Sequence, residues 1–432
     1  MTRPANFANA LVWTLCVLCA FSIQTQITLF SSETYLGLRI NLTDIIAPFA
    51  GIAILVTLLR RQSVWPDLKM PYIYHWLAAL TLILGGALLY GWHLYGELSH
   101  WALVNKFCGW FILLAIMGLG AWIAANARRA QLELLLKITL YFLLAFVLLE
   151  TLVLSLQSFS SLQAWIPRND FIATPIDGLM ANRNAYSFLY VAVFAISTNF
   201  YFSNTPLIKP NYSYILFFLL PFFVVFNASR ASWVTLALIF LIMAVLNWHQ
   251  KKKVFKLAAC LLIGTAILAL VLMDTQRRQE VNYISPRMLE ILEGTPETHA
   301  GDIMRVTIIK MAWPMVRERP LLGSGLGSAM IEQQRQTGAI INLIDNTSLW
   351  LLVETGVVGL LTFLGFYIVV TRNLFQRLKD DDEFSKTLRQ SVLYIIFGFT
   401  LMCLLHELLY TRFLWFFLGL ALALPARMRQ DV

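Results

Sequence analysis

Charged residues are scarce in this chain of 432 residues. Asp, Glu, Lys and Arg make up 13% of it, whereas an ordinary soluble domain has about 25%. Hydrophobic residues make up 59%, and the mean hydropathy is +0.68. These values exclude a water-soluble globular fold, so we expect a lipid bilayer to be the solvent for most of the chain.

Cysteine is also rare. All five cysteines lie inside apolar runs, where a thiol behaves as a small hydrophobic side chain. Cys16 and Cys19 have the spacing of a redox or metal motif, but their wholly apolar surroundings make helix packing the simpler interpretation. We therefore expect no disulfide bond, no metal and no cofactor.

Long apolar runs are what the chain has in abundance. Their length and continuity are typical of membrane-spanning helices and exclude the short alternating strands of a barrel. We predict an all-α, polytopic transmembrane bundle of about 12 spans that forms a single integral membrane domain over residues 1–432. The twelve runs lie at 9–31, 44–59, 74–92, 108–127, 134–157, 185–204, 213–228, 232–248, 254–273, 347–371, 390–408 and 411–426.

The net charge of +9 does not indicate a nucleic-acid partner, because the basic residues gather in short loops at every second turn of the chain. That pattern predicts both termini in the cytoplasm. No small-residue cleavage site follows the first run before Asp44, so we expect this run to be retained as a span. Two longer polar segments, 158–184 and 274–346, then face outward. The second joins the ninth and tenth spans, and we expect it to contain an amphipathic helix near 302–318 at the membrane interface.

Four arginines remain on the outer side, next to the ends of spans: Arg168, Arg183, Arg230 and Arg305. A guanidinium group can bind a phosphate through two hydrogen bonds and stays charged at any biological pH. Any one of them can equally pair with a carboxylate or with lipid headgroups. As a set, they favour a clamp for a diphosphate.

Acidic and amide residues flank the tenth span. A carboxylate at Asp345, beside Asn346, is suited to deprotonating a sugar hydroxyl, although capping of the helix explains the pair almost equally well. Glu354 lies inside the span, so we expect it to face the bundle interior and to pair with an outer arginine. Glycines alternate at 323–327, a pattern that permits close approach of the backbone to a ligand.

Taken in order, these motifs resemble those of a known family, the O-antigen ligase and polymerase superfamily of bacterial inner-membrane glycosyltransferases. The resemblance runs from residue 182 onward, whereas the first five spans are similar only in hydropathy. The motifs are Asn182-Arg183-Asn184-Ala185, Ser229-Arg230-Ala231, Arg305 with Trp313, Pro320-Leu321-Leu322-Gly323-Ser324-Gly325-Leu326-Gly327, and Asn346 through Glu354-Thr355-Gly356-Val357-Val358-Gly359.

The resemblance implies a GT-C-like membrane fold in the inner membrane, an undecaprenyl-diphosphate-linked glycan as donor, and inverting transfer without a metal at the periplasmic face. It also implies that Arg183, Arg230 and Arg305 hold the diphosphate. One departure concerns the base, because the family pattern has His before the Asn where this chain has Asp345. The aspartate either replaces the histidine as base or disables the site, and His299 is the nearest alternative imidazole unless it is merely a solvated loop residue.

A lipopolysaccharide O-antigen ligase, with lipid A-core as acceptor, is the closest match within that family. The same donor would serve an O-antigen polymerase, whose acceptor is a second lipid-linked glycan, or a ligase with a protein acceptor. A transporter of lipid-linked glycans without catalysis is a further alternative. Transporters place broken helices and polar groups near the membrane midplane, whereas the polar residues of this chain gather at one face.

Overall fold

The computed structural model describes residues 7–25, 28–32, 38–60, 63–64, 66–68, 70–157, 183–227, 229–277, 298–337, 344 and 346–427. The chain divides into two compact units, each assembled from separate stretches of sequence. Unit 1 comprises residues 1–127, 302–381 and 399–428, and unit 2 comprises residues 128–301, 382–398 and 429–432.

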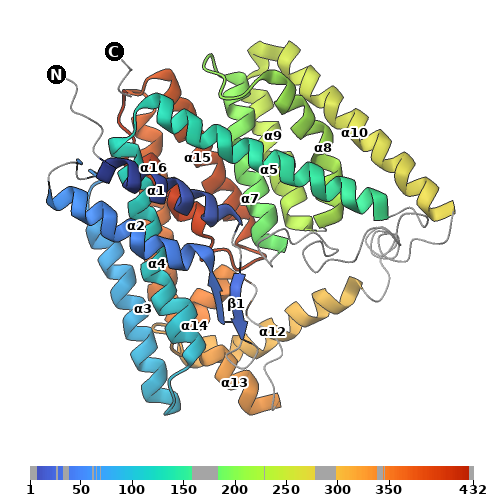
Figure 1. The fold of residues 1–432 in the computed structure, drawn as a ribbon. Helices are drawn as coiled ribbons and strands as arrows, with labels where there is room; N and C mark the ends of the chain where they lie inside the picture. The colour runs from blue at the N-terminus through green and yellow to red at the C-terminus, as the bar shows by residue number, and fades with distance from the viewer. Residues whose placement is uncertain are drawn as a thin grey trace. The chain divides into compact units, whose positions relative to one another are not determined.

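Each of the twelve predicted apolar runs overlaps a helix over most of its length (Figure 1). Helix α15 (Glu383–Met402) contributes residues to both units. The other matching helices of unit 1 are α1 (Phe7–Thr25), α2 (Leu42–Leu59), α3 (Ile73–Tyr95), the π-helix η1 (Ala102–Cys108) with α4 (Gly109–Asn126), α14 (Thr347–Arg377) and α16 (Arg412–Ala423). Those of unit 2 are α5 (Arg129–Gln157), α7 (Arg183–Phe202), α8 (Pro210–Asn227), α9 (Arg230–Leu246), and α10 (Lys251–Arg277) with the short η3 (Trp248–Gln250) before it.

Seven of the described helices are long and apolar enough to cross a membrane, so the prediction of twelve spans is confirmed only in part. Four further apolar helices are shorter. The 12 residues of α16, at about 1.5 Å each, extend for about 18 Å, well short of the roughly 30 Å of a hydrocarbon core. The seven are Leu42–Leu59, Ile73–Tyr95, Ala102–Asn126, Arg129–Leu149, Asn184–Phe202, Trp248–Leu270 and Thr347–Arg377.

The all-α prediction missed one small element. Helix α1 ends at Thr25, and β1 (Thr28–Ser32) then pairs antiparallel with β2 (Leu38–Asn41), so the predicted run 9–31 is not one helix. In this two-stranded hairpin, Phe30 lies opposite Ile40. The apolar residues of this segment continue the hydropathy of the run before it, and this concealed its strand character.

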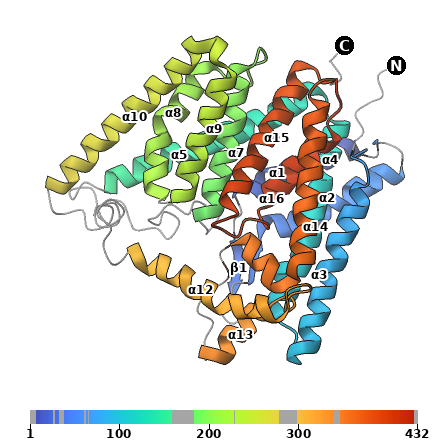
Figure 2. The same cartoon turned by 180° about the vertical axis from the view of Figure 1, so that it is seen from behind.

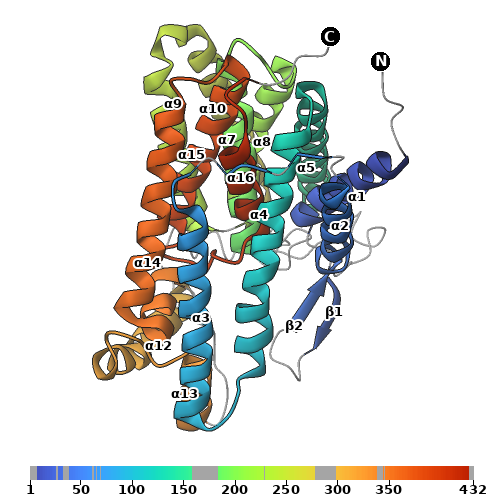
Figure 3. The same cartoon turned by 90° about the vertical axis from the view of Figure 1, so that its left-hand side faces the viewer.

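Unit 1 is organised around the short helix α16. Every residue from Phe413 to Ala423 is buried, as expected for a helix that is apolar on all sides. Glycines allow α16 and α4 to pack closely: a Cβ atom on Gly120 would meet the Phe416 carbonyl, and one on Gly419 would meet the Met117 carbonyl. Figure 3 shows α3 between α14 and α4 in the same unit.

Unit 2 is organised around α7, in which every residue from Ala185 to Phe202 is buried. Asn199 donates hydrogen bonds to the Thr387 carbonyl (2.8 Å) and to Ser391 Oγ (3.2 Å), which links α7 to α15. Helix α8 packs against α10 (Figure 2), and α7 contacts both α8 and α9. A Cβ atom on Gly264 of α10 would meet the Phe218 carbonyl of α8, so these two helices are also in close contact.

Between α10 and α14, the structure describes α12 (Thr298–Glu318) and α13 (Ser328–Thr337). The predicted helix near 302–318 is therefore present. Val306, Ile309 and Trp313 follow one another at helical spacing and are 46–49% exposed. Such an exposed apolar stripe is consistent with the expected position at a membrane interface.

Candidate functional site

Helix α14 is broken near its N-terminal end. Gly356 has φ 68° and ψ −171°, which are accessible essentially to glycine alone. The break separates a short piece, 347–355, from a longer piece, 357–377. At about 1.5 Å per residue the longer piece extends for about 31 Å, enough by itself to cross a hydrocarbon core of about 30 Å. We therefore expect the short piece at one edge of the membrane.

The backbone groups freed by the break are paired with the glycine-containing loop 319–327. Irregular backbone inside a membrane protein is tolerated only where such partners exist. Four hydrogen bonds join the two segments: Ser324 N–H to the Val353 carbonyl (2.8 Å), Gly325 N–H to the Glu354 carbonyl (3.1 Å), Val357 N–H to the Pro320 carbonyl (2.8 Å) and Val358 N–H to the Leu321 carbonyl (3.2 Å).

Three glycines permit this close contact. Gly323, Gly325 and Gly327 have φ values of 71°, 92° and 81°, in the region that favours glycine. A Cβ atom on Gly323 would meet the backbone of Gly356, and one on Gly325 would meet that of Gly91 in α3. The close approach predicted from the glycine spacing is thus made to the chain's own helices.

Glu354 lies immediately before the break and is 1% exposed. It faces the interior as predicted, but the expected arginine partner is wrong. Its carboxylate accepts hydrogen bonds from Trp350 Nε1 (2.8 Å) and from the backbone N–H of Gly327, and the cation acting on it is Lys106. A buried carboxylate requires such donors because its lost hydration is otherwise uncompensated.

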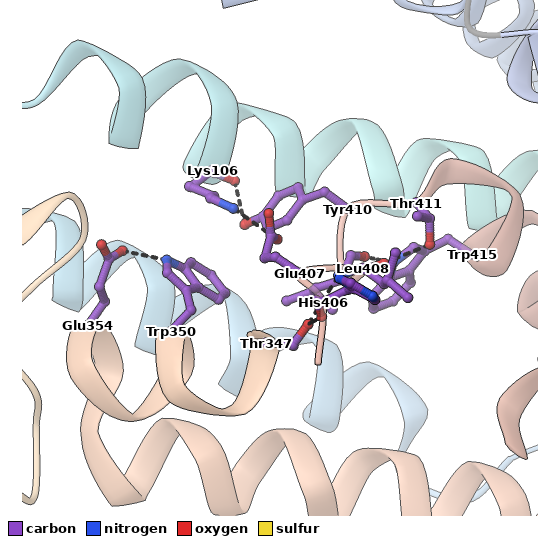
Figure 4. A network of polar contacts seen from close by, with 11 residues as sticks. Lys106, Thr347, Trp350, Glu354, His406, Glu407, Leu408, Tyr410, Thr411 and Trp415 are labelled. Atoms are coloured by element: carbon purple, nitrogen blue, oxygen red, sulfur yellow. Dashed lines mark hydrogen bonds and ion pairs between the residues drawn. The ribbon is translucent and has the colours of Figure 1, made fainter. Parts of the chain in front are cut away.

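Lys106 is a buried cation that the sequence analysis did not select. It lies in the π-helix η1 with its side chain only 4% exposed, and its Nζ is 2.9 Å from Glu407 Oε1 (Figure 4). Three aromatic rings surround the ammonium group: Trp101, Trp350 and Tyr410 have centroids at 4.8, 4.4 and 4.4 Å. Cation–π contacts of this kind stabilise a desolvated ammonium, and π-helical turns are frequent at functional sites.

Tyr410 connects η1 with the turn that carries Glu407. Its hydroxyl donates a hydrogen bond to the Lys106 carbonyl at 2.9 Å. Burial, with the neighbouring carboxylates adding to it, raises the pKa of the Tyr410 phenol well above its ordinary value. The phenol therefore stays protonated and keeps this hydrogen bond at any biological pH.

The turn 403–411 replaces the end of the predicted run 390–408, because α15 stops at Met402. Thr347, the first residue of α14, binds the turn on both sides of Glu407. Its Oγ1 donates to the His406 carbonyl (3.0 Å) and accepts from Leu408 N–H (3.1 Å). The backbone around Glu407 is thus held by the start of α14.

Asn346 is the N-cap of α14. Its Oδ1 accepts a hydrogen bond from Leu349 N–H (2.8 Å), and its Nδ2 donates to the Leu404 carbonyl. Both ends of the amide therefore make structural contacts, which favours the capping interpretation for this residue. Asp345, the predicted base, lies outside the described residues.

Two of the predicted arginines begin helices of unit 2. Arg183 is the first residue of α7 and Arg230 is the first residue of α9, where its side chain is exposed. Ser229 Oγ donates to Asn184 Oδ1 at 3.3 Å, so the two helix N-termini are neighbours. Helix N-termini favour anions through their unpaired N–H groups and their dipoles. The structure thus joins two motifs that are separate in the sequence.

The other predicted site residues are Arg305, His299 and Arg168. Arg305 and His299 belong to α12, but their side chains, like that of Arg183, lie outside the described part of the structure, and Arg168 lies outside it altogether. Arg305 belongs to unit 1, whereas Arg183 and Arg230 belong to unit 2. The predicted three-arginine clamp therefore stays a prediction.

Fold and site together define a multi-pass α-helical membrane protein with a buried charged cluster beside a broken helix. Residues 215–364 match the family model described as O-antigen ligase. The matched part runs from α8 into α14 and includes Arg230, Arg305, Asn346 and Glu354. It confirms the resemblance to the O-antigen ligase and polymerase superfamily, whose members are membrane glycosyltransferase-like enzymes. A search of curated proteins found no significant match.

Proposed function

We propose that this protein is an O-antigen ligase. It transfers a glycan from undecaprenyl diphosphate to lipid A-core at the periplasmic face of the bacterial inner membrane, with inversion at the anomeric carbon and without a metal. The family match over residues 215–364 carries the proposal, since it contains two of the three candidate arginines together with Asn346 and Glu354.

The donor site in this proposal uses Arg183, Arg230 and Arg305. As the glycosyl bond breaks, negative charge grows on the departing diphosphate, and guanidinium groups stabilise that charge most where it develops. The neighbouring N-termini of α7 and α9 support an anion site beside Arg183 and Arg230. Arg168 is a further candidate for donor support.

The acceptor hydroxyl must lose a proton as it attacks. Asp345 is the candidate base from the sequence, and it directly precedes the Asn346 cap. A carboxylate is ionised near neutral pH, with an ordinary pKa of about 3.9, and can accept that proton in the transition state. His299 and Glu354 follow as alternatives.

A transporter of lipid-linked glycans is the alternative from another class, and broken helices are typical of transporters. In α14, however, the break lies close to one end, and the piece after it is long enough to span the bilayer alone. This geometry favours a site at the membrane surface, as a transferase with a surface acceptor requires.

Transfer by the purified protein tests the function. We expect a defined undecaprenyl-diphosphate glycan to be consumed only when lipid A-core is present, and the glycan to appear on that acceptor. Lipid A-core and excess lipid-linked glycan should be supplied together, with products separated by mass. Elongated lipid-linked glycan as the main product would identify a polymerase, and donor movement across proteoliposomes without transfer would identify a transporter.

The proposed orientation puts α12 outside and the segment after α14 inside. Lys310 and Asp380 are both exposed in unit 1. We therefore expect Lys310→Cys to react with a membrane-impermeant thiol reagent in intact spheroplasts, and Asp380→Cys to react only after lysis. The background should carry Cys108→Ser and Cys260→Ser, because the other three cysteines are buried. The reverse labelling pattern would place the candidate site in the cytoplasm and reject the periplasmic reaction.

A further inference from the structure

Two carboxylates, those of Glu354 and Glu407, interact with Lys106, and they differ in how far their side chains are exposed. Glu354 is 1% exposed and is engaged by an indole and a backbone N–H group. The Glu407 side chain is 21% exposed, although its Oε1 is itself buried and faces Lys106. Because Oε1 faces Lys106, Oε2 is the oxygen of Glu407 through which it would accept a proton from a molecule arriving from outside.

Glu407 is held in place from several directions. Thr347 hydrogen-bonds the backbone on either side of it, at His406 and Leu408. Lys106 contacts Oε1 from η1. A base must be oriented to within a fraction of an ångström of its substrate, and a side chain anchored at one oxygen in this way presents the other in a fixed direction.

The charges of the cluster are also suited to proton transfer. Among the described residues, Lys106 forms an ion pair with Glu407 and also exerts a favourable charge interaction on Glu354. When Glu407 takes up a proton, the Lys106 ammonium still has the opposite charge of Glu354 nearby, which limits the cost of the buried cation. The cluster can thus hold the extra proton during a turnover.

On the basis of the proposed function, we propose that Glu407 is the base that accepts the proton of the attacking acceptor hydroxyl, and that Lys106 is its positioning residue. The sugar oxygen of the acceptor bonds to the anomeric carbon of the donor. The bond from that carbon to the diphosphate oxygen breaks, and its electron pair leaves with the diphosphate. The hydroxyl proton passes to Glu407 Oε2 and afterwards to water.

The test separates chemistry from donor binding. In Glu407→Gln, transfer should fall by about 10²- to 10⁴-fold, the usual contribution of a general base. Binding of the undecaprenyl-diphosphate glycan, measured by displacement of a labelled donor, should stay unchanged. Glu407→Asp should recover part of the activity. Glu133→Gln is the matched control, since it breaks two partly exposed ion pairs in α5, with Arg129 and Lys137, and should transfer normally.

A double variant distinguishes catalysis from folding. Lys106→Met alone leaves buried carboxylates without their cation and should lower the melting temperature, and adding Glu407→Gln should restore much of it. The double variant should be folded, bind donor and remain unable to transfer. Full transfer by the double variant would mean that the ion pair is only structural and would overturn the inference.

Asp345→Asn completes the experiment. If it abolishes transfer while Glu407→Gln transfers normally, Asp345 is the base and the inference is wrong. A parent protein that binds donor yet transfers to neither lipid A-core nor a second lipid-linked glycan would reject the proposed function itself, and the role of Glu407 with it. An active parent with an active Glu407→Gln variant would reject only the inference.

Discussion

Replacing Arg230 by lysine should lower kcat/KM for the lipid-linked donor by about 10- to 100-fold. Lysine keeps the positive charge but loses the planar fork that binds a phosphate through two hydrogen bonds. Arg230 is exposed at the first position of α9, next to the start of α7, so the substitution removes no buried packing. Arg183→Lys and Arg305→Lys should behave in the same way.

The loss should appear mainly in the chemical step, because the arginines act on charge that develops as the diphosphate leaves. Single-turnover measurements with saturating donor can establish this. Arg129→Lys is a matched control: it also changes the first residue of a helix, α5, but on the side that the charge pattern assigns to the cytoplasm. Unchanged kcat/KM in all three arginine variants would leave pairing with ordinary lipid headgroups as their role.

Replacing Gly356 by alanine should destabilise the protein by about 1–3 kcal/mol from backbone strain alone, because a residue other than glycine is strained at these backbone angles. The added Cβ atom would also meet the Leu321 carbonyl and the Gly323 backbone nitrogen. Backbone atoms cannot move aside as a side chain can. The loop 319–327 would therefore have to separate from α14, and four hydrogen bonds depend on that contact.

A lower melting temperature in detergent measures the effect, and transfer activity should fall with it because Glu354 lies two residues away. Gly86→Ala is the matched control, since Gly86 lies within α3 with open space around the added atom. That variant should be as stable as the parent. If Gly356→Ala were equally stable, the break in α14 would not depend on glycine.

Several features of the site were predictable from the sequence because they depend on local chemistry. An acidic residue inside an apolar run has to face the interior, and Glu354 does. An Asn directly before such a run caps the helix, as Asn346 does. The alternating glycines predicted close approach of the backbone to a ligand, and the structure shows close approach to the chain's own helices.

The partners of these residues were not predictable, because they come from distant parts of the chain. Tyr410 and Lys106 are 304 residues apart, yet they share a hydrogen bond. A lone lysine at the start of an apolar run was the available signal for Lys106, but the same pattern is typical of lysines that extend to the membrane surface. The prediction of an arginine beside Glu354 was wrong for the same reason. It was based on charge alone, and charge does not specify which helices pack together.

The sequence by itself determined that this is a helical membrane protein, where its apolar runs lie and which family its motifs resemble. Hydropathy and short motifs are local properties, and the bilayer requires helical hydrogen bonding wherever the chain crosses it. Only the tertiary structure decided that α14 is broken at Gly356 and that the loop 319–327 satisfies the break. It also brought Lys106, Glu354 and Glu407 into one cluster, because packing between helices, which no local pattern specifies, selects the neighbours of a buried charge.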